Sequence, residues 1–277
     1  MTHRFLIAEP DSIISSLPEL ETIKYPLPSN HRNEKDHWEE NYLENYYDEV
    51  LNVTGCLKVK QRITQSLDPS MRRIHIPGCG SKPHLQQYLI ENFPYLDKVI
   101  CTDWSETALT LARRSFDHPK LVYQKADTSQ LNPDDGPCDC VIVVNSILSA
   151  SDILNRQMIR ACHRVLKQGG LFIGLFPDVL CSVELSSISS ELSELLDGTI
   201  DVGKNMVYER RQGMNQIFYT PLRLKQIFIE AGFEIKFDHI QRIAFDSPFF
   251  QGEYLRLYGL QDPDLCIWEN IVEVKKS

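Results

Sequence analysis

Short runs of apolar residues alternate along the chain with longer segments whose apolar residues recur at helical spacing. Two such runs, at residues 74–76 and 98–101, are each followed by a segment of this kind, at residues 85–90 and 108–116. Short apolar runs bounded by turn residues are typical of buried strands, and spacing of three or four residues is typical of amphipathic helices. Strands joined by helices predict an α/β fold with right-handed crossovers and a mostly parallel sheet with helices on both faces.

The alternation continues through the middle of the chain. Residues 121–123 predict a third strand and residues 139–144 a fourth. An amphipathic helix is expected at residues 153–166, with a fifth strand after it. A further helix is expected at residues 221–231, because a glycine suited to a helix C-cap follows it.

An unusually long passage separates the fifth strand from that last helix. Residues 183–196 have helical spacing, and residues 205–210 and 214–219 predict two short strands. We interpret residues 177–220, approximately, as an inserted helix-hairpin cap that serves as a substrate lid or a dimer surface. A second insertion, residues 242–262, is rich in Phe and Tyr. Both insertions are candidate walls of a pocket, because ligands of open α/β sheets bind near the carboxyl ends of the strands.

The N-terminal part has a different character from the rest. Residues 1–33 are rich in proline and polar residues and predict an extended arm. Helical spacing begins at residues 34–47 and returns at residues 50–67. We therefore expect an N-terminal arm and helical lid at residues 1–67 and a main domain at residues 68–277.

The chemistry is concentrated where the first two strands end. Gly78 and Gly80 directly follow the first strand, and a helix follows them. Glycine accepts positive φ and lets the backbone approach a ligand, and a helix N-terminus offers free amide groups. Asp103 ends the second strand, where a ribose-binding acid lies in dinucleotide-type folds. The pattern predicts a cofactor site at this edge of the sheet.

Five segments, in this order and spacing, resemble the motifs of the class I S-adenosylmethionine-dependent methyltransferases. They are Gly78-Cys79-Gly80, Asp103-Trp104-Ser105, Ala126-Asp127-Thr128, residues 139–145 and residues 164–173. The resemblance implies a Rossmann-like fold of seven strands, with residues 233–239 and 265–275 as candidates for its antiparallel hairpin. It also implies S-adenosyl-L-methionine as the cofactor. The implied cofactor residues are Gly78, Cys79, Gly80, Asp103, Trp104, Asp127, Thr128 and Asn145.

Two positions bear on the alternatives to this interpretation. A nicotinamide-binding fingerprint needs a third glycine three residues after the second, and Pro83 occupies that position. An NAD-dependent oxidoreductase therefore fits less well. Many class I methyltransferases carry an acid two residues before the first glycine, where this chain has Ile76. The departure leaves open a non-catalytic cofactor-binding subunit.

Aromatic residues of the N-terminal helix suggest a narrower resemblance. Trp38, Tyr42 and Tyr46 recur four residues apart, and the segment Tyr42-Leu43-Glu44-Asn45-Tyr46-Tyr47 resembles the Tyr-Leu-x-x-Tyr-Tyr of small-molecule amine N-methyltransferases acting on nicotinamide or phenylethanolamine. The resemblance implies that Tyr42 faces the substrate, and that Tyr46 and Tyr47 lie near the methionine end of the cofactor. Tyr219, a potential proton acceptor, is a second candidate substrate residue.

Composition limits the partners. The net charge is −9, which argues against a nucleic-acid surface, because phosphate binding needs concentrated Lys and Arg. No apolar run approaches the ~18 residues of a membrane helix. Eight cysteines are scattered without a metal-site pattern, so we expect reduced thiols, no metal and a cytoplasmic location. The oligomeric expectation is a monomer or homodimer.

These features together predict a methyltransferase that acts on an N or O atom of a small molecule by in-line displacement. Positioning and desolvation supply most of the catalysis in such a reaction, so we assign no catalytic residue. A protein methyltransferase of the lysine-modifying type is the main alternative, because some of those enzymes resemble the same aromatic and Gly-Cys-Gly segments.

Overall fold

The computed structural model describes residues 38–39, 42, 57–132, 136–188, 200–209, 214–244 and 268–277. The expected N-terminal arm, Tyr46, Tyr47 and nearly all of the second insertion lie outside these ranges.

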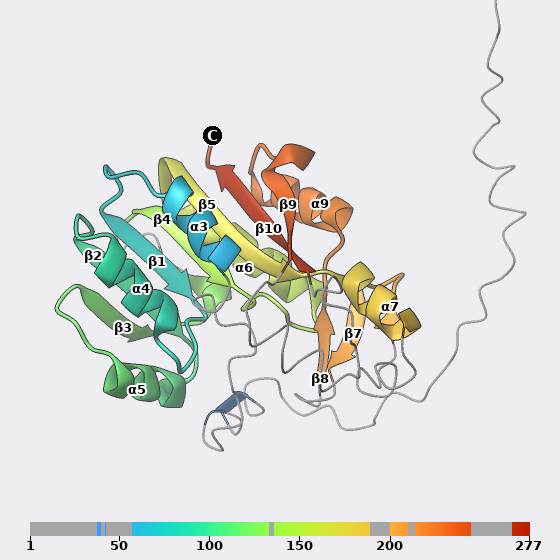
Figure 1. Cartoon of the computed structure of the whole chain (residues 1–277), viewed down its shortest axis with the longest axis horizontal. Helices are drawn as coiled ribbons and strands as arrows, with labels where there is room; N and C mark the ends of the chain where they lie inside the picture. The colour runs from blue at the N-terminus through green and yellow to red at the C-terminus, as the bar shows by residue number, and fades with distance from the viewer. Residues whose placement is uncertain are drawn as a thin grey trace, which may run out of the picture. The chain divides into compact units, whose positions relative to one another are not determined.

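A seven-stranded sheet with the order β3-β2-β1-β4-β5-β10-β9 organises the main domain (Figure 1). Its strands are β1 (Arg73–Pro77), β2 (Lys98–Asp103), β3 (Leu121–Lys125), β4 (Cys138–Val144), β5 (Leu166–Pro177), β9 (Ile240–Ala244) and β10 (Trp268–Lys275). The first five pair in parallel, and β10 pairs antiparallel with both β5 and β9. This is the Rossmann-like methyltransferase fold that the sequence predicts.

One predicted strand is misplaced. Residues 233–239 were expected to form the first strand of the terminal hairpin, but β9 begins only at Ile240. Phe233 and Ile235 are buried in the core, whereas Phe237 is 52% exposed and lies in a short 3-10 helix, η3 (Phe237–His239). The apolar alternation therefore reflects a loop that packs on the core between a helix and the true strand.

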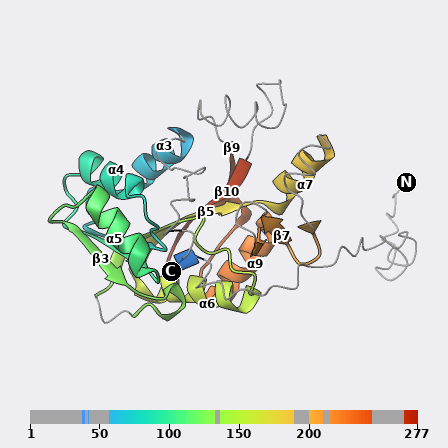
Figure 2. The same ribbon diagram turned by 90° about the horizontal axis from the view of Figure 1, so that it is seen from below.

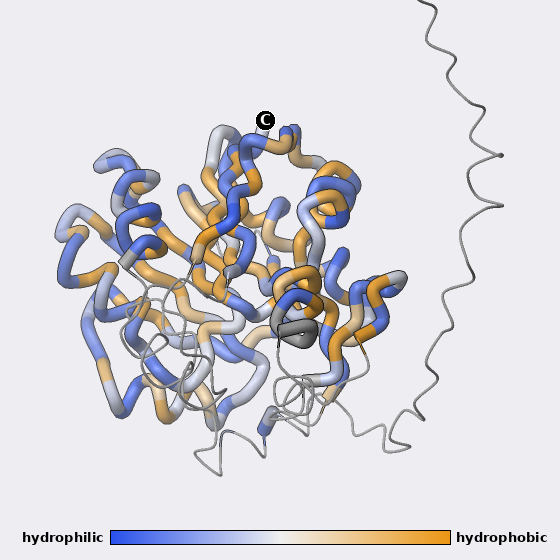
Figure 3. The backbone as a smooth tube through the Cα atoms, turned by 45° about the vertical axis from the view of Figure 1, so that its right-hand side comes forward, coloured by the Kyte–Doolittle hydropathy of each residue, from blue (hydrophilic) through white to orange (hydrophobic). Residues whose placement is uncertain are grey.

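Helices cover both faces of the sheet. The face with α3 (Leu57–Ser66), α4 (His84–Asn92) and α5 (Glu106–Ser115) buries one apolar cluster, and the face with α6 (Asp152–Val165) and α9 (Pro221–Ala231) buries the other. Figure 2 shows α3 and α4 on one side of the strands and α6 and α9 on the other. Strand residues alternate between the clusters, as in β4, where Ile142 faces the first and Val143 the second. Figure 3 shows apolar segments running through the middle of the tube and polar segments toward its outside.

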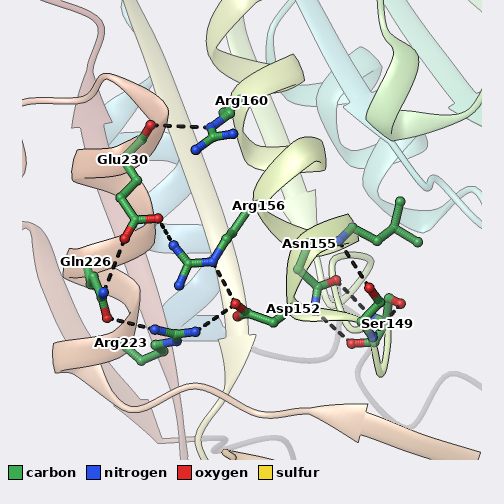
Figure 4. Close-up of polar contacts among 10 residues, drawn as sticks. Ser149, Asp152, Asn155, Arg156, Arg160, Arg223, Gln226 and Glu230 are labelled. Carbon is green, nitrogen blue, oxygen red and sulfur yellow. Dashed lines mark hydrogen bonds and ion pairs between the residues drawn. The ribbon is translucent and has the colours of Figure 1, made fainter.

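A polar network joins α6 to α9 (Figure 4). Asp152 accepts hydrogen bonds from Arg156 at 2.6 Å and from Arg223 at 2.7 Å, and Arg156 also pairs with Glu230. All four side chains are partly exposed, so water and salt screen these pairs. The network fixes how the two helices lie against each other more than it stabilises them.

After β5 the chain forms α7 (Val179–Ile188) and a small antiparallel sheet of β6 (Ile200–Asp201), β7 (Met206–Glu209) and β8 (Met214–Ile217). The hairpin of β7 and β8 forms where the sequence predicts it. The helix begins at Val179, four residues before the expected start, and residues 189–196 of the expected helix lie outside the described residues. Figure 1 shows α7 and β7 near the carboxyl end of β5. Among the described helices, none has the length and apolar character to cross a membrane.

Candidate functional site

The turn after β1 has a backbone that only glycine adopts without strain. Gly78 and Gly80 have φ angles of 63° and 67°. A Cβ on Gly78 would lie 2.4 Å from the Cβ of Ser146, which is closer than packed atoms approach. The amide of Cys79 donates to the carbonyl of Thr102 at 3.0 Å, so the turn is tied to β2. The backbone of this turn is therefore fixed in place, without covering side chains of its own at Gly78 and Gly80, at the carboxyl ends of β1 and β2.

Asp103, the last residue of β2, lies against that turn. One carboxylate oxygen accepts a hydrogen bond from the amide of Gly80 at 3.0 Å, and the other accepts one from the amide of Ser105 at 2.9 Å. Burial raises the pKa of Asp103 to about 6, and the Glu39 carboxylate also raises it, while the backbone amides of Ser105 and Gly80 oppose the shift. A fixed, buried carboxylate of this kind is suited to accept hydrogen bonds from ligand hydroxyl groups.

Described residues of the N-terminal segment lie over the same turn. The Tyr42 hydroxyl is 3.8 Å from the point that a Cβ on Gly80 would occupy, and Tyr42 is 8% exposed. The hydroxyl of Thr107, in the first turn of α5, donates to a carboxylate oxygen of Glu39. Glu39 could not be predicted from the sequence in the way that the aromatic stripe could, because it is one of several acids in that segment.

The loop after β3 approaches the end of β2. The amide of Ala126 donates to the carbonyl of Asp103 at 2.9 Å. The Asp127 side chain accepts from the amide of Ser129 at 2.9 Å and caps η1 (Thr128–Gln130), and Thr128 is buried. Trp104, half-buried, follows β2 directly. The structure thus brings Trp104, Asp127 and Thr128 to the same sheet edge as the glycine turn.

Asn145 follows β4 with a φ of 47°, an angle uncommon outside glycine. Its side-chain amide donates to a carboxylate oxygen of Glu269 at 3.0 Å. The hydroxyl of the next residue, Ser146, donates to the carbonyl of Pro77 at 2.9 Å and so links this turn to the end of β1. Glu269 was not predicted as a site residue. In the sequence it is only an acid at the start of an apolar run near the C-terminus.

The surroundings of Tyr219 correct the expectation that it faces the substrate. It is 0% exposed, its hydroxyl donates to the carbonyl of Ile147 at 3.2 Å, and its ring packs edge-to-face on Phe176. Burial raises the pKa of its hydroxyl, so the phenol stays protonated at neutral pH and is not available as a base. Tyr219 is therefore a core residue.

The residues at this edge fit an adenosine-type cofactor. The two glycines leave space beside the backbone, and the Asp103 carboxylate can accept hydrogen bonds from hydroxyl groups. The half-buried Trp104 supplies an aromatic surface. The acid that many class I methyltransferases place before the first glycine is replaced by Ile76, which is buried in the strand. Within the described residues, no group of three or more His, Cys, Asp or Glu side chains is arranged to hold a metal ion.

Comparison with known families agrees with this geometry. Residues 77–170 match the sequence model of a methyltransferase domain, and this stretch contains the glycine turn, Asp103, Asp127 and Asn145. No curated protein sequence is similar enough to the chain to count as a match.

Solved structures give the same fold. An S-adenosylmethionine-dependent methyltransferase from Anabaena variabilis superposes with a TM-score of 0.64 at 17% identity, covering 94% of this chain and all (100%) of its own. A possible histamine N-methyltransferase from Thermotoga maritima has a TM-score of 0.52 at 17% identity, over 87% of this chain and 99% of its own. A putative methyltransferase from Haloferax volcanii, in complex with the Trm112 methyltransferase activator, has a TM-score of 0.57 at 14% identity, over 89% and 97%.

Proposed function

We propose that the methyl acceptor of this S-adenosylmethionine-dependent methyltransferase is an N or O atom of a small molecule. The observation that carries the proposal is the position of Tyr42, an aromatic residue packed beside Gly80 and almost fully buried. The contact between Glu39 and Thr107 puts a second described residue of this segment beside the same edge of the sheet. An aromatic residue over the turn favours a small acceptor, because a protein substrate needs an open groove.

The residues of the sheet edge have separate roles in holding the cofactor. The carboxylate of Asp103 accepts hydrogen bonds from the ribose hydroxyls, while the turn from Gly78 to Gly80 gives the backbone room to approach the methionine part. Trp104 and the loop at Asp127 flank the adenine. When bound, the cofactor supplies an electrophilic methyl group on a sulfonium.

The protein's contribution to the reaction is alignment and desolvation. Alignment of the acceptor atom with the methyl group supplies effective molarities of roughly 10⁵ M or more, without a dedicated base. The Tyr42 ring limits the access of water, and exclusion of water strengthens the electrostatic interactions inside the site. Ile76 has no group that accepts a hydrogen bond at its side chain. The methionine amino group must therefore be held by backbone carbonyls or by another segment.

Two lines of support favour nitrogen as the acceptor atom. The segment that begins at Tyr42 resembles the aromatic motif of amine N-methyltransferases. One structural neighbour is described as a possible histamine N-methyltransferase. We therefore place amines first among the acceptors to be tested.

The test is a methyl-acceptor screen with S-adenosylmethionine labelled in its methyl group. The panel contains small amines, phenols and a lysine-containing peptide, and Asp103→Asn serves as the control for dependence on the cofactor site. We expect label to appear in a small-molecule product and to fall at least tenfold in the variant. Label in the peptide but in no small molecule would refute the proposal.

A further inference from the structure

A buried carboxylate lies at the same edge of the sheet, on a strand far away in the sequence. Glu269 is the second residue of β10 and pairs with Pro177, the last residue of β5. Because β10 runs antiparallel to β5, its beginning meets the carboxyl ends of the parallel strands. Glu269 shares its sheet face with Ile271, whose cluster also contains the apolar residues of α3, α4 and α5.

The two side chains that meet here have unused acceptors. Glu269 is 3% exposed, and one of its oxygens accepts from Asn145. Its other oxygen and the carbonyl oxygen of Asn145 are buried and have no hydrogen-bond partner in the part of the chain that the structure describes. An unpaired buried oxygen costs about 1–3 kcal/mol, and more when it is charged. Because the two side chains contact each other, the pair with Glu269 in its charged form offers two acceptors to a ligand that brings N–H donors.

The pair is continuous with the cofactor edge. Ser146, next to Asn145, contacts both Pro77 and the space beside Gly78. Gly80, at the other end of the same turn, donates to Asp103. The carboxyl edge of the sheet therefore runs from Asp103 through the glycine turn to Asn145 and Glu269. The pair lies on the side of the turn away from Asp103, because β4 and β10 lie on one side of β1 in the sheet and β2 lies on the other.

The titratable groups on the described elements next to Glu269 include more acids than bases. They are Asp178 before α7, Cys181 and Glu184 within α7, Arg242 on β9 and Glu273 farther along β10. Arg242 stacks on the Trp268 ring at 3.9 Å, and Glu273 pairs with Arg62. Among the described residues, no Lys, Arg or His lies within ion-pair distance of Glu269.

We propose that Glu269 and Asn145 bind the amino group of an amine substrate and that Glu269 takes a proton from it. This inference rests on the proposed function. The substrate ammonium donates to the free oxygen of Glu269 and to the carbonyl oxygen of Asn145. A primary or secondary amine satisfies both acceptors, whereas an alcohol has only one O–H and no positive charge.

The step balances as follows. One N–H proton passes to the Glu269 carboxylate and leaves a neutral amine with a free electron pair. That pair forms the bond to the methyl carbon while the sulfur–carbon bond breaks and its electrons stay on sulfur. The products are the methylated ammonium and S-adenosylhomocysteine, and Glu269 then loses its proton to solvent.

The raised pKa of the Glu269 carboxyl suits a group that takes a proton near neutral pH. Burial raises the pKa of Glu269 to about 8, against a smaller opposing effect of the hydrogen bond from Asn145. At pH 7 the free carboxyl is therefore largely protonated, and it must lose this proton before it can pair with an ammonium. Binding of an ammonium to the pair then releases about one proton, because the pair and the amine together hold one fewer.

The experiment is calorimetry on the full chain saturated with S-adenosylhomocysteine. Phenethylamine, tryptamine and histamine are titrated at pH 7 in two buffers of different ionisation enthalpy, and 2-phenylethanol and tryptophol are the neutral counterparts. We expect at least one amine to bind about tenfold or more tightly than the alcohols, and to release about one proton.

Three variants locate the effect. Glu269→Gln keeps the shape of the side chain, and it should abolish both the preference for amines and the proton release. Asn145→Gly fits the positive φ and should weaken amine binding. Glu273→Gln, on the same strand and face but paired with Arg62, should leave amine binding unchanged.

S-adenosylhomocysteine affinity separates the possible failures. The inference is wrong if the wild-type protein binds S-adenosylhomocysteine but prefers no amine over the alcohols. It is also wrong if Glu269→Gln keeps both the preference for amines and the proton release. In either case the methyltransferase assignment stands. If S-adenosylhomocysteine does not bind the wild-type protein, the proposed function fails as well.

Discussion

Two buried carboxyl groups define the ends of the candidate site, and neither has a cationic partner among the described residues. Asp103 is held by backbone amides, and Glu269 by the amide of Asn145. Neutral donors orient a carboxylate without neutralising it, so burial raises both pKa values. Each carboxyl group therefore remains able to accept a hydrogen bond from a ligand.

The raised pKa of Asp103 predicts how cofactor affinity depends on pH. Ribose hydroxyls donate to the charged carboxylate, so S-adenosylhomocysteine affinity should fall as the pH drops below about 6. Asp103→Asn should bind at least tenfold more weakly and lose this dependence, as measured by calorimetry between pH 5 and 8. Asp117→Asn, an exposed acid beyond α5, is the matched control. Equal pH profiles for Asp103→Asn and wild type would contradict this role.

Gly78 is predicted to be irreplaceable for steric reasons. Gly78→Ala places a Cβ 2.4 Å from Ser146 in addition to the strain of a positive φ, whereas Gly169→Ala has a φ of 73° and open space around the new methyl group. The strain alone costs about 1–2 kcal/mol. Chemical denaturation should show a loss of this size for Gly169→Ala, and a larger loss together with weakened S-adenosylhomocysteine binding for Gly78→Ala. A Gly78→Ala protein that binds normally would overturn this interpretation.

Site residues could be predicted from the sequence where they lie close to one another along the chain. Gly78, Gly80 and Asp103 belong to one strand-turn-helix-strand unit, so local spacing finds them. Glu269 meets Asn145 across 124 residues, and no local pattern reports that contact. Only the order of strands in the folded sheet brings them together.

At the scale of elements, strands and helices with strong apolar periodicity were predictable, and irregular connections were not. The helix at residues 221–231 has its Thr220 N-cap and its Gly232 C-cap at the expected ends. The strand expected at residues 233–239 is instead a packed loop, because tertiary burial of Phe233 and Ile235 produces the alternation of a strand without strand pairing.

Tyr219 lies between β8 and α9, and its effect is predicted to be structural. Tyr219→Phe removes a buried hydrogen bond to Ile147 and should lower the free energy of unfolding by about 1 kcal/mol. S-adenosylhomocysteine affinity and the KM for the acceptor should not change. Denaturation together with steady-state kinetics measures both, and a large rise in KM at unchanged stability would restore Tyr219 as a substrate residue.

For the whole molecule, the α/β class and the sheet follow from alternating strands and helices, and the match over residues 77–170 covers the part that carries the glycine turn. Of the two residues proposed to bind the amine, Asn145 lies within that match and Glu269 lies outside it.

The most direct test of the account is calorimetric titration of the purified protein with S-adenosylhomocysteine, with NADH as the competing ligand and Asp103→Ala as the variant. The account predicts micromolar binding of S-adenosylhomocysteine to the wild-type protein, at least tenfold weaker binding to the variant, and no binding of NADH. Binding of NADH in place of S-adenosylhomocysteine, or equal S-adenosylhomocysteine affinity in the variant, would contradict it.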